Sequence, residues 1–250
     1  MTQDVRPNPA AFFLEGGDTG VLLLHGFPGS TTDVRLLGTC LHERGLTISA
    51  PLLPGHGTQP ADLNQVHWQD WTACAEEALT QLSTRCGVVF VGGLSLGSLI
   101  TIYLGARHAE IAGIMLYSPA IAVRNPLIHL TPLLKHIVPF WSAGKSDAVD
   151  PAAEKRLSTY AVTPTRGAHE VYKLMRAVPS LLPQVTAPAL IVHSTGDRSI
   201  TPHSAQLTYD RIGSADKVLV TLHNSGHNIL VDAEWETVAS KTYQFIEEHQ

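Results

Sequence analysis

The stretch VVFVGGLSLG, residues 88–97, decides the fold of this chain. It opens with apolar, mostly β-branched residues, as buried parallel strands do, and apolar residues recur at helical spacing behind Ser95. A strand, the pattern G-x-S-x-G and a helix together predict a nucleophile elbow, a sharp turn that lifts the serine hydroxyl above the sheet. The small residues Gly93 and Gly97 let the two backbones pass close together. A glycine-rich turn with an incidental serine is the alternative, which the flanking strand and helix disfavour.

Length and composition fit one globular α/β domain. The 250 residues are 44% hydrophobic and 16% charged, which suffices to bury a sizeable core. The net charge of −5 and the lack of a basic run argue against a nucleic-acid partner. No signal peptide is indicated, and no apolar run approaches the ~20 residues that cross a bilayer, so we expect no stable membrane insertion. Cys40, Cys74 and Cys86 form no C-x-x-C pair, which favours a reducing, cytoplasmic location.

Strands and helices alternate along most of the chain. Beside 88–91, apolar runs of strand length lie at 11–14, 21–24, 46–50, 111–117, 189–193 and 217–222. Helical spacing predicts helices near 32–41, 68–82, 96–104, 202–212 and 235–248. This alternation predicts a mainly parallel sheet with helices on both faces.

The alternation stops between residues 119 and 187. Prolines recur there, no run suited to a sheet is present, and apolar residues are dense. About seventy residues between successive strands is too long for an ordinary crossover. We therefore expect a core of residues 1–118 and 188–250, with a small helical cap inserted at 119–187 over the carboxyl edge of the sheet. Two ordinary crossover helices with long loops are the alternative.

Two further side chains stand where a serine nucleophile needs them. Serine is a poor nucleophile at its ordinary pKa, so an imidazole must take its proton and a carboxylate must orient that imidazole. Asp197 follows one buried strand and His227 follows the next, so both loops open at the same sheet edge as Ser95. Their order along the chain is the one that hydrolases with a G-x-S-x-G turn use. The sequence therefore predicts the catalytic triad Ser95, Asp197 and His227.

Other histidines and aspartates are weaker candidates for the triad. His223 lies closer to the end of its strand, and His193 lies within a strand, where a structural role is expected. Asp197 also has a simpler interpretation, in which it caps the following helix with Ser199 and Thr201. Three more aspartates occupy helix or post-histidine positions that place a carboxylate poorly: Asp210, Asp216 and Asp232.

Two backbone N–H groups are predicted to bind the oxyanion of an acyl-transfer reaction. Leu96 offers the N–H directly after the serine, where the helix dipole adds to it. Phe27 offers the second, from the loop HGFPG at residues 25–29. Pro28 carries no N–H and cannot serve, although it stiffens the loop. A tight turn without a catalytic role is the alternative for this loop.

These motifs resemble those of the α/β-hydrolase superfamily, and within it the bacterial carboxylesterase and monoacylglycerol lipase group. The resemblance covers the chain from about residue 20 onward. It rests on HGFPG at 25–29, PGHGT at 54–58, W-x-x-W at 68–71, GLSLG at 93–97, TPT at 163–165, GD at 196–197 and SGH at 225–227.

The resemblance implies hydrolysis of carboxylic esters without a cofactor, and we expect the reaction to pass through an acyl-enzyme on Ser95. No cluster of histidine, cysteine and aspartate has the spacing of metal ligands, so no metal is expected. The implied substrates are small molecules, short- to medium-chain esters or monoacylglycerols, and the expected assembly is a monomer or homodimer. For His56 the resemblance implies a structural role, bonded to an indole or a backbone carbonyl. Two departures matter: Ser98 stands where many relatives have glycine, and residues 121–155 match only loosely. The identity of the substrate is therefore not carried over.

Apolar residues of the cap are the candidates for substrate binding. Some must pack on the core, and others are expected to line an acyl tunnel, among them Ile128, Leu133, Ile137, Phe140 and Met175. The same triad also serves thioester hydrolysis, acyl transfer to an alcohol, amide cleavage and carbon–carbon bond hydrolysis. A ligand-binding member without turnover is disfavoured, because all three catalytic residue types are present.

Overall fold

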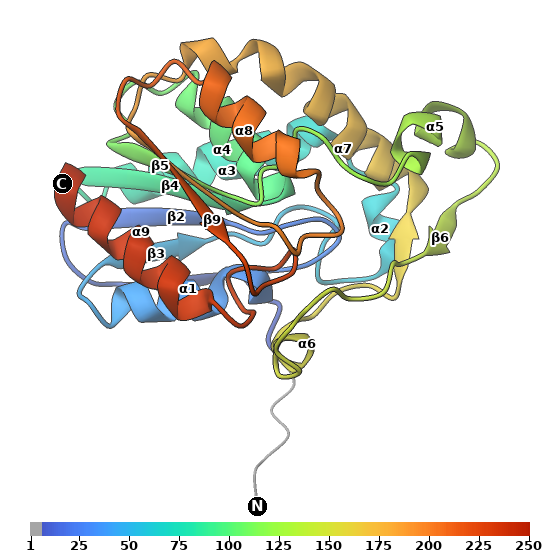
Figure 1. The fold of residues 1–250 in the computed structure, drawn as a ribbon, viewed down its shortest axis with the longest axis horizontal. Helices are drawn as coiled ribbons and strands as arrows, with labels where there is room; N and C mark the ends of the chain where they lie inside the picture. The colour runs from blue at the N-terminus through green and yellow to red at the C-terminus, as the bar shows by residue number, and fades with distance from the viewer. Residues whose placement is uncertain (1–6) are drawn as a thin grey trace, which may run out of the picture.

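A twisted sheet lies at the centre of the molecule, whose computed structural model describes residues 7–250 (Figure 1). Within this range seven strands pair in the order β1-β3-β2-β4-β5-β8-β9, all parallel except β1 with β3. The mainly parallel sheet predicted from the sequence is confirmed. Its strands are β1 (Phe12–Leu14), β2 (Thr19–Leu24), β3 (Thr47–Ala50), β4 (Val88–Leu94), β5 (Gly113–Tyr117), β8 (Ala189–Ser194) and β9 (Lys217–Leu222).

Helices cover both faces of the sheet, as the alternation predicts (Figure 1). One face carries α1 (Thr32–His42) and α9 (Trp235–His249), and the other carries α3 (Trp68–Ser83), α4 (Leu96–Gly105) and α8 (Pro202–Arg211). Successive residues of a strand point to opposite faces, so β4 contributes to two apolar cores. Phe90 packs with α1 and α9, whereas Val89 and Val91 pack with α3 and α4.

The turn between β4 and α4 is strained in the way that a nucleophile elbow requires. Ser95 has φ 55° and ψ −110°, a conformation that residues other than glycine rarely adopt. A Cβ on Gly97 would overlap the carbonyl oxygen of Leu24, and a Cβ on Gly93 would overlap the carbonyl group of Gly97. Neither glycine therefore has room for a side chain, because the backbones of β2, β4 and α4 meet at this point.

The insertion between β5 and β8 contains helices and a second, smaller sheet. Its helices are α5 (Leu127–Leu134), α6 (Ala153–Arg156) and α7 (Thr165–Ala177), followed by the 3₁₀ turns η1 (Val178–Ser180) and η2 (Leu182–Gln184). The strands β6 (Phe140–Ser142) and β7 (Val162–Pro164) pair antiparallel. The expectation of an insertion without strands was wrong on this point, because three-residue strands show no periodicity. The helix α2 (Pro60–Leu63) was also missed, because its four residues are too few to show a helical periodicity.

The parts of the insertion differ in how they relate to the core. Helix α7 packs against α3 and α4 and so joins the layer that covers one face of the sheet. In contrast, α5, β6 and α6 lie beyond the sheet, with α5 at the upper right of Figure 1, β6 at the right and α6 below the sheet. The insertion therefore has two parts: α7 belongs to the helical layer of the core, and the residues before it project from that layer.

The state of the cysteines and the length of the helices can be compared with what the composition predicts. All three cysteines are free thiols, and burial raises the pKa of Cys74 and of Cys86. A raised pKa leaves little thiolate at neutral pH, so these two side chains are poor nucleophiles. Among residues 7–250, no helix is long and apolar enough to cross a membrane.

Gly97→Ala tests the crowding at the elbow. The added methyl group would overlap a backbone carbonyl that cannot move without disturbing β2, so we expect the free energy of unfolding to fall by about 3 kcal/mol or more. Gly144→Ala is the control, because a Cβ there meets nothing within 4 Å, and it should change stability by less than ~0.5 kcal/mol. Urea denaturation measures both variants. Equal stabilities would show that the elbow tolerates a side chain.

Candidate active site

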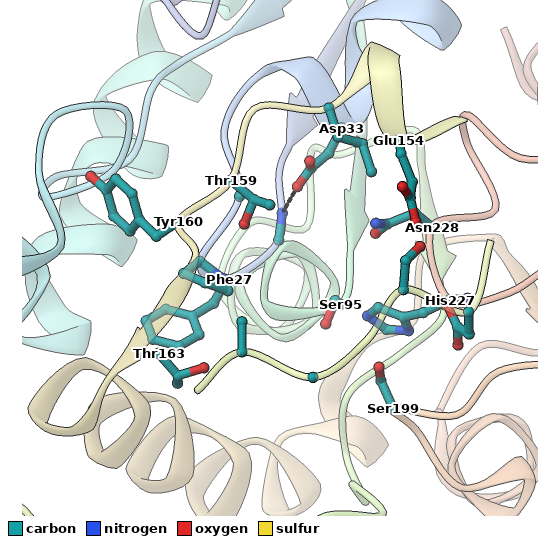
Figure 2. Close-up of a pocket in the computed structure, with 18 of the residues that line it drawn as sticks. Phe27, Asp33, Ser95, Glu154, Thr159, Tyr160, Thr163, Ser199, His227 and Asn228 are labelled. Atoms are coloured by element: carbon teal, nitrogen blue, oxygen red, sulfur yellow. Dashed lines mark hydrogen bonds between the residues drawn. The ribbon is translucent and has the colours of Figure 1, made fainter. Parts of the chain in front are cut away.

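A cavity of about 610 Å³ lies at the elbow, between the sheet and the insertion (Figure 2). Phe27, Ser95 and His227 come from separate segments of the core and all line it. Residues 143–147 and 157–160 of the insertion also line it. A cavity of this size holds a small molecule and is a typical dimension for a ligand site. The predicted reactive side chains and a substrate can therefore meet here.

Asp197 and His227 form a hydrogen-bonded pair. Nδ1 of His227 lies 2.8 Å from Oδ2 of Asp197, and the two side chains are only 15% and 5% exposed. The other oxygen of Asp197 accepts the backbone N–H groups of Ser199 and Ile200 at 2.7 and 2.8 Å. The carboxylate of Asp197 thus orders the turn before α8 and also holds the imidazole. The interpretation of Asp197 as a helix cap was wrong, because both N–H donors precede α8, whose N-cap residue Thr201 makes no side-chain cap hydrogen bond.

The electrostatics of the pair favour an ionised aspartate and a basic imidazole. Burial alone would raise the pKa of Asp197, but the hydrogen bond and charge of His227, with the two N–H donors, hold that pKa below its ordinary value. Burial alone would lower the pKa of His227. The carboxylates of Asp197, Asp147 and Asp33 outweigh the burial, so the pKa of His227 lies above its ordinary value. The imidazole is thereby made a stronger proton acceptor.

Ser95 stands beside His227 in the cavity. In Figure 2 the imidazole ring is turned toward the serine side chain. The Ser95 N–H donates to the carbonyl of Tyr117 at 2.9 Å, which fixes the turn to β5. The buried hydroxyl of Ser98 donates to the Ser95 carbonyl and accepts the N–H of Ala120 at 3.3 Å. Ser98, which stands where many relatives have glycine, thus ties the elbow to the start of the insertion.

The predicted oxyanion donors, Phe27 and Leu96, both lie at the elbow. Leu96 is the first residue of α4, so no helix carbonyl is placed to accept its N–H. The loop of residues 25–29 lies against the elbow, because Gly97 packs on the backbone of Leu24 and of the following residue. Phe27 borders the same cavity as Ser95 (Figure 2). The backbone segments that carry the two predicted donors therefore both lie beside Ser95.

Two histidines of the neighbouring loops have structural contacts. Nε2 of His25 accepts the N–H of Leu53 at 3.1 Å, and burial lowers the pKa of His25 to about 4, so this imidazole is neutral. Nδ1 of His56 lies 3.2 Å from the carbonyls of Leu53 and Pro54. The indole of Trp71 donates to the same Pro54 carbonyl at 3.0 Å. His56 thus has the carbonyl contacts that the structural interpretation expects.

The rival triad candidates lie elsewhere. His223 contacts the Thr195 hydroxyl at 3.4 Å, and His193 contacts Thr221 at 3.2 Å. Neither histidine borders the cavity at Ser95. Asp210 contacts Gln206 and Asp216 contacts His249, both at the surface. Asp232 is fully buried under the insertion.

The described residues that line the cavity include none of the five apolar residues expected to form an acyl tunnel. Ile128 and Met175 are buried in the core, whereas Leu133 and Ile137 are 73% and 76% exposed. Phe140 borders a separate pocket together with Ile137. Apolar residues at helical spacing mark one face of a helix, but the spacing does not say what that face contacts. The lining has instead many polar side chains, among them Glu154, Ser158, Thr159, Thr163 and Asn228.

Asp33 is a cavity residue that the sequence analysis missed. Its carboxylate accepts the N–H of Gly26 at 3.0 Å and so holds the loop of Phe27 (Figure 2). A Cβ on Gly29 would overlap this carboxylate. Burial raises the pKa of Asp33 to about 7, although the Gly26 N–H and the charge of His227 lower it. An aspartate in the first turn of a helix is favoured by the helix dipole, so the sequence offers no signal for a second role.

A mainly parallel sheet with a serine elbow at its carboxyl edge, and with an aspartate–histidine pair on the later loops, defines an α/β hydrolase. Residues 18–234 match the family described as serine aminopeptidase, S33, and the chain belongs to this family. The membership agrees with the resemblance found from the motifs.

Named relatives extend over nearly the whole chain. A thermostable monoacylglycerol lipase of Bacillus sp. (strain H-257) is 32% identical over 95% of this chain and 94% of the relative. A carboxylesterase of Bacillus subtilis (strain 168) is 31% identical over 97% of each. A solved structure from work on LipS and LipT, two metagenome-derived lipolytic enzymes, superposes with a TM-score of 0.93 at 32% identity, covering 98% of this chain and all of that one.

Asp33→Asn tests whether the buried carboxyl costs stability at alkaline pH. Because the folded pKa is raised from 3.8 to about 7, the folded state keeps a proton that the unfolded chain releases in this range. The stabilising contribution of the protonated Asp33 carboxyl is therefore full below pH 3.8 and is lost as the pH rises through about 7. Asparagine cannot ionise, so the variant escapes this loss. We expect its free energy of unfolding, relative to the wild type, to gain roughly 2 kcal/mol or more between pH 4.5 and pH 8.

Urea denaturation at the two pH values measures this gain. A constant offset from a poorly fitting amide cancels in the comparison. A difference between variant and wild type that did not change with pH would contradict a raised pKa at Asp33.

Proposed function

We propose that this chain is a serine carboxylesterase that hydrolyses short- to medium-chain esters or monoacylglycerols through an acyl-enzyme on Ser95. The observation that carries the proposal is the position of Ser95 at a strained elbow, in the same cavity as the hydrogen-bonded pair of Asp197 and His227. The chain is a carboxylic ester hydrolase: two relatives above 30% identity, named monoacylglycerol lipase and carboxylesterase, match it almost end to end.

The first half of the reaction forms the acyl-enzyme. Nε2 of His227 takes the proton of the Ser95 hydroxyl while Oγ attacks the ester carbonyl carbon. The N–H groups of Phe27 and Leu96 bind the resulting oxyanion. Asp197 holds the imidazolium at Nδ1 and stabilises its charge. The tetrahedral intermediate then expels the alkoxy oxygen, which receives the proton from His227, and the alcohol leaves.

The second half releases the acid. Water enters the place of the alcohol, and His227 removes a proton from it as its oxygen attacks the acyl carbon. The same two N–H groups bind the second oxyanion. When the bond to Ser95 breaks, His227 returns the proton to Oγ, so the enzyme regains its starting form.

The lining of the cavity supports small esters of polar alcohols. Thr159, Thr163 and Asn228 bring hydroxyl and amide groups that suit a hydroxylated alcohol. Phe27 and Leu157 add apolar surface for an acyl chain. Each buried methylene contributes up to ~0.8 kcal/mol, so kcat/KM should rise with chain length until the cavity is filled.

The description of the family raises amide cleavage as a second activity, because aminopeptidases break peptide bonds. The same triad can attack an amide, although its amine leaving group must be protonated as it departs. The relatives named above favour esters. Parallel assays with a p-nitrophenyl ester series and with amino-acid p-nitroanilides distinguish the two, and faster turnover of the anilides would overturn the ester assignment.

Replacement of the nucleophile tests the mechanism directly. Ser95→Ala should fold as the wild type does and lose roughly 10⁴- to 10⁶-fold in kcat on p-nitrophenyl butyrate, as triad removal does in other serine hydrolases. A fluorophosphonate should label the wild type at Ser95 and leave the variant unlabelled. More than a tenth of the wild-type activity in the variant would rule out Ser95 as the nucleophile.

The pH dependence tests the general base. Only neutral imidazole accepts a proton, so kcat/KM should rise with pH through an apparent pKa above the ordinary histidine value of 6.5. His227→Ala should lose most of the activity, and the matched variant His223→Ala should keep it, because His223 lies outside the cavity. The opposite ranking of the two variants would assign the base to His223.

A further inference from the structure

We propose that Asp147, a residue of the insertion, is a positioning residue that ties the loops of Asp197 and His227 together. One of its carboxylate oxygens accepts the backbone N–H of His227 at 3.0 Å. The other accepts the N–H of Arg198, next to Asp197, at 2.7 Å. A single side chain thus bridges the two core loops that hold the imidazole and its carboxylate. This inference rests on the proposed function, since it assigns a catalytic task to those loops.

Asp147 lies in close contact with the loop of His227. A Cβ on Gly226 would overlap the backbone and the carboxylate of Asp147, so the residue before His227 must be glycine for the two segments to meet. In return, the buried carboxylate of Asp232 accepts the N–H groups of Val149 and Gly226 at 2.9 and 2.6 Å. The insertion and the histidine loop therefore exchange hydrogen bonds in both directions.

The backbone of His227 is held at both of its polar groups. Its N–H donates to Asp147, and its carbonyl accepts the hydroxyl of Ser118 at 2.9 Å. The loop of Asp197 is held in a similar way, because Nε of Arg124 donates to the Asp197 carbonyl at 3.1 Å. Without Asp147, the N–H of His227 loses its acceptor, and the backbone that carries the imidazole loses one of the contacts that hold it. Small displacements of reacting groups lower the rate steeply.

Asp147 also adds charge to the site. The carboxylates of Asp197, Asp147 and Asp33 face His227 from the β8–α8 loop, the insertion and α1, and all three raise the pKa of His227. Glu154 and Lys145 line the same cavity. Removal of the Asp147 charge therefore lowers the pKa of the base and moves the acid limb of the kcat/KM profile to lower pH.

Two substitutions separate geometry from charge. Asp147→Asn removes the charge and replaces one acceptor oxygen with an NH₂ group. Asp147→Glu keeps the charge but moves the acceptor by one methylene. The control is Asp70→Asn, which makes the same chemical change in a carboxylate that accepts a backbone N–H at the start of α3, outside the cavity.

The measurements are the pH profile of ester hydrolysis and the exchange rates of the backbone amides of residues 198 and 227. Asp147→Asn should lower kcat about 10-fold, change KM less than kcat, and shift the midpoint of the profile down by roughly half a pH unit. Asp147→Glu should also lower kcat, but the midpoint of its pH profile should stay at the wild-type value because the charge is kept. Both variants should exchange the two amides faster than the wild type, and Asp70→Asn should match the wild type throughout.

The amide exchange decides the contact independently of catalysis. If Ser95→Ala retained activity, the proposed function would fail, yet protection of these amides by Asp147 could still be tested. If Asp147→Asn exchanged both amides at wild-type rates, the bridge would be refuted. If exchange were faster but kcat and the pH midpoint were unchanged, Asp147 would be structural only, and the positioning role would be wrong.

Discussion

The close contact of three backbones at the elbow is the constraint on which the rest of the structure depends. Gly97 lies against the carbonyl of Leu24, and Gly93 lies against the first turn of α4. This contact aligns the end of β2 with the end of β4, so the loop of Phe27 and the strained Ser95 come to the same place. The parallel sheet then adds the loops after β8 and β9 at the same edge. Each group of the proposed mechanism is thus brought in by the end of a strand.

The sequence predicts those parts of the site that follow from strand ends and fails on those that follow from side-chain packing. Ser95, Asp197 and His227 each follow a parallel strand, and parallel strands bring their carboxyl ends to one edge of the sheet. The edge strand β9 is less buried than its apolar residues suggest. Ile137 and Leu133 show the limit, because their spacing identifies an apolar face that the structure leaves exposed. The pair β6–β7 shows another limit, since strands of three residues depend on the rest of the insertion for their stability.

Three carboxylates organise the site without belonging to the predicted triad. Asp33 holds the loop of Phe27, whereas Asp147 and Asp232 join the insertion to the loop of His227. Nothing in their local sequence distinguishes them from surface or helix-start aspartates. Their partners are backbone N–H groups from distant parts of the chain, and such contacts follow only from the assembled fold. The buried carboxylate of Asp33 lowers stability when it ionises, and an active site commonly bears that cost in return for preorganised geometry.

The wide separation along the chain of the groups that hold His227 has a consequence for biosynthesis. Ser118 and Asp147, which hydrogen-bond to the backbone of His227, lie in the middle of the chain, and His227 follows β9, the last strand along the chain. Contacts between such distant segments form late, because the entropy of closing long loops must be overcome first. A nascent chain that has not yet released β9 from the ribosome lacks the loop of His227 beside Ser95. In the proposed mechanism, Ser95 therefore gains its base only when the sheet is complete, and a reactive serine would report that folding has finished.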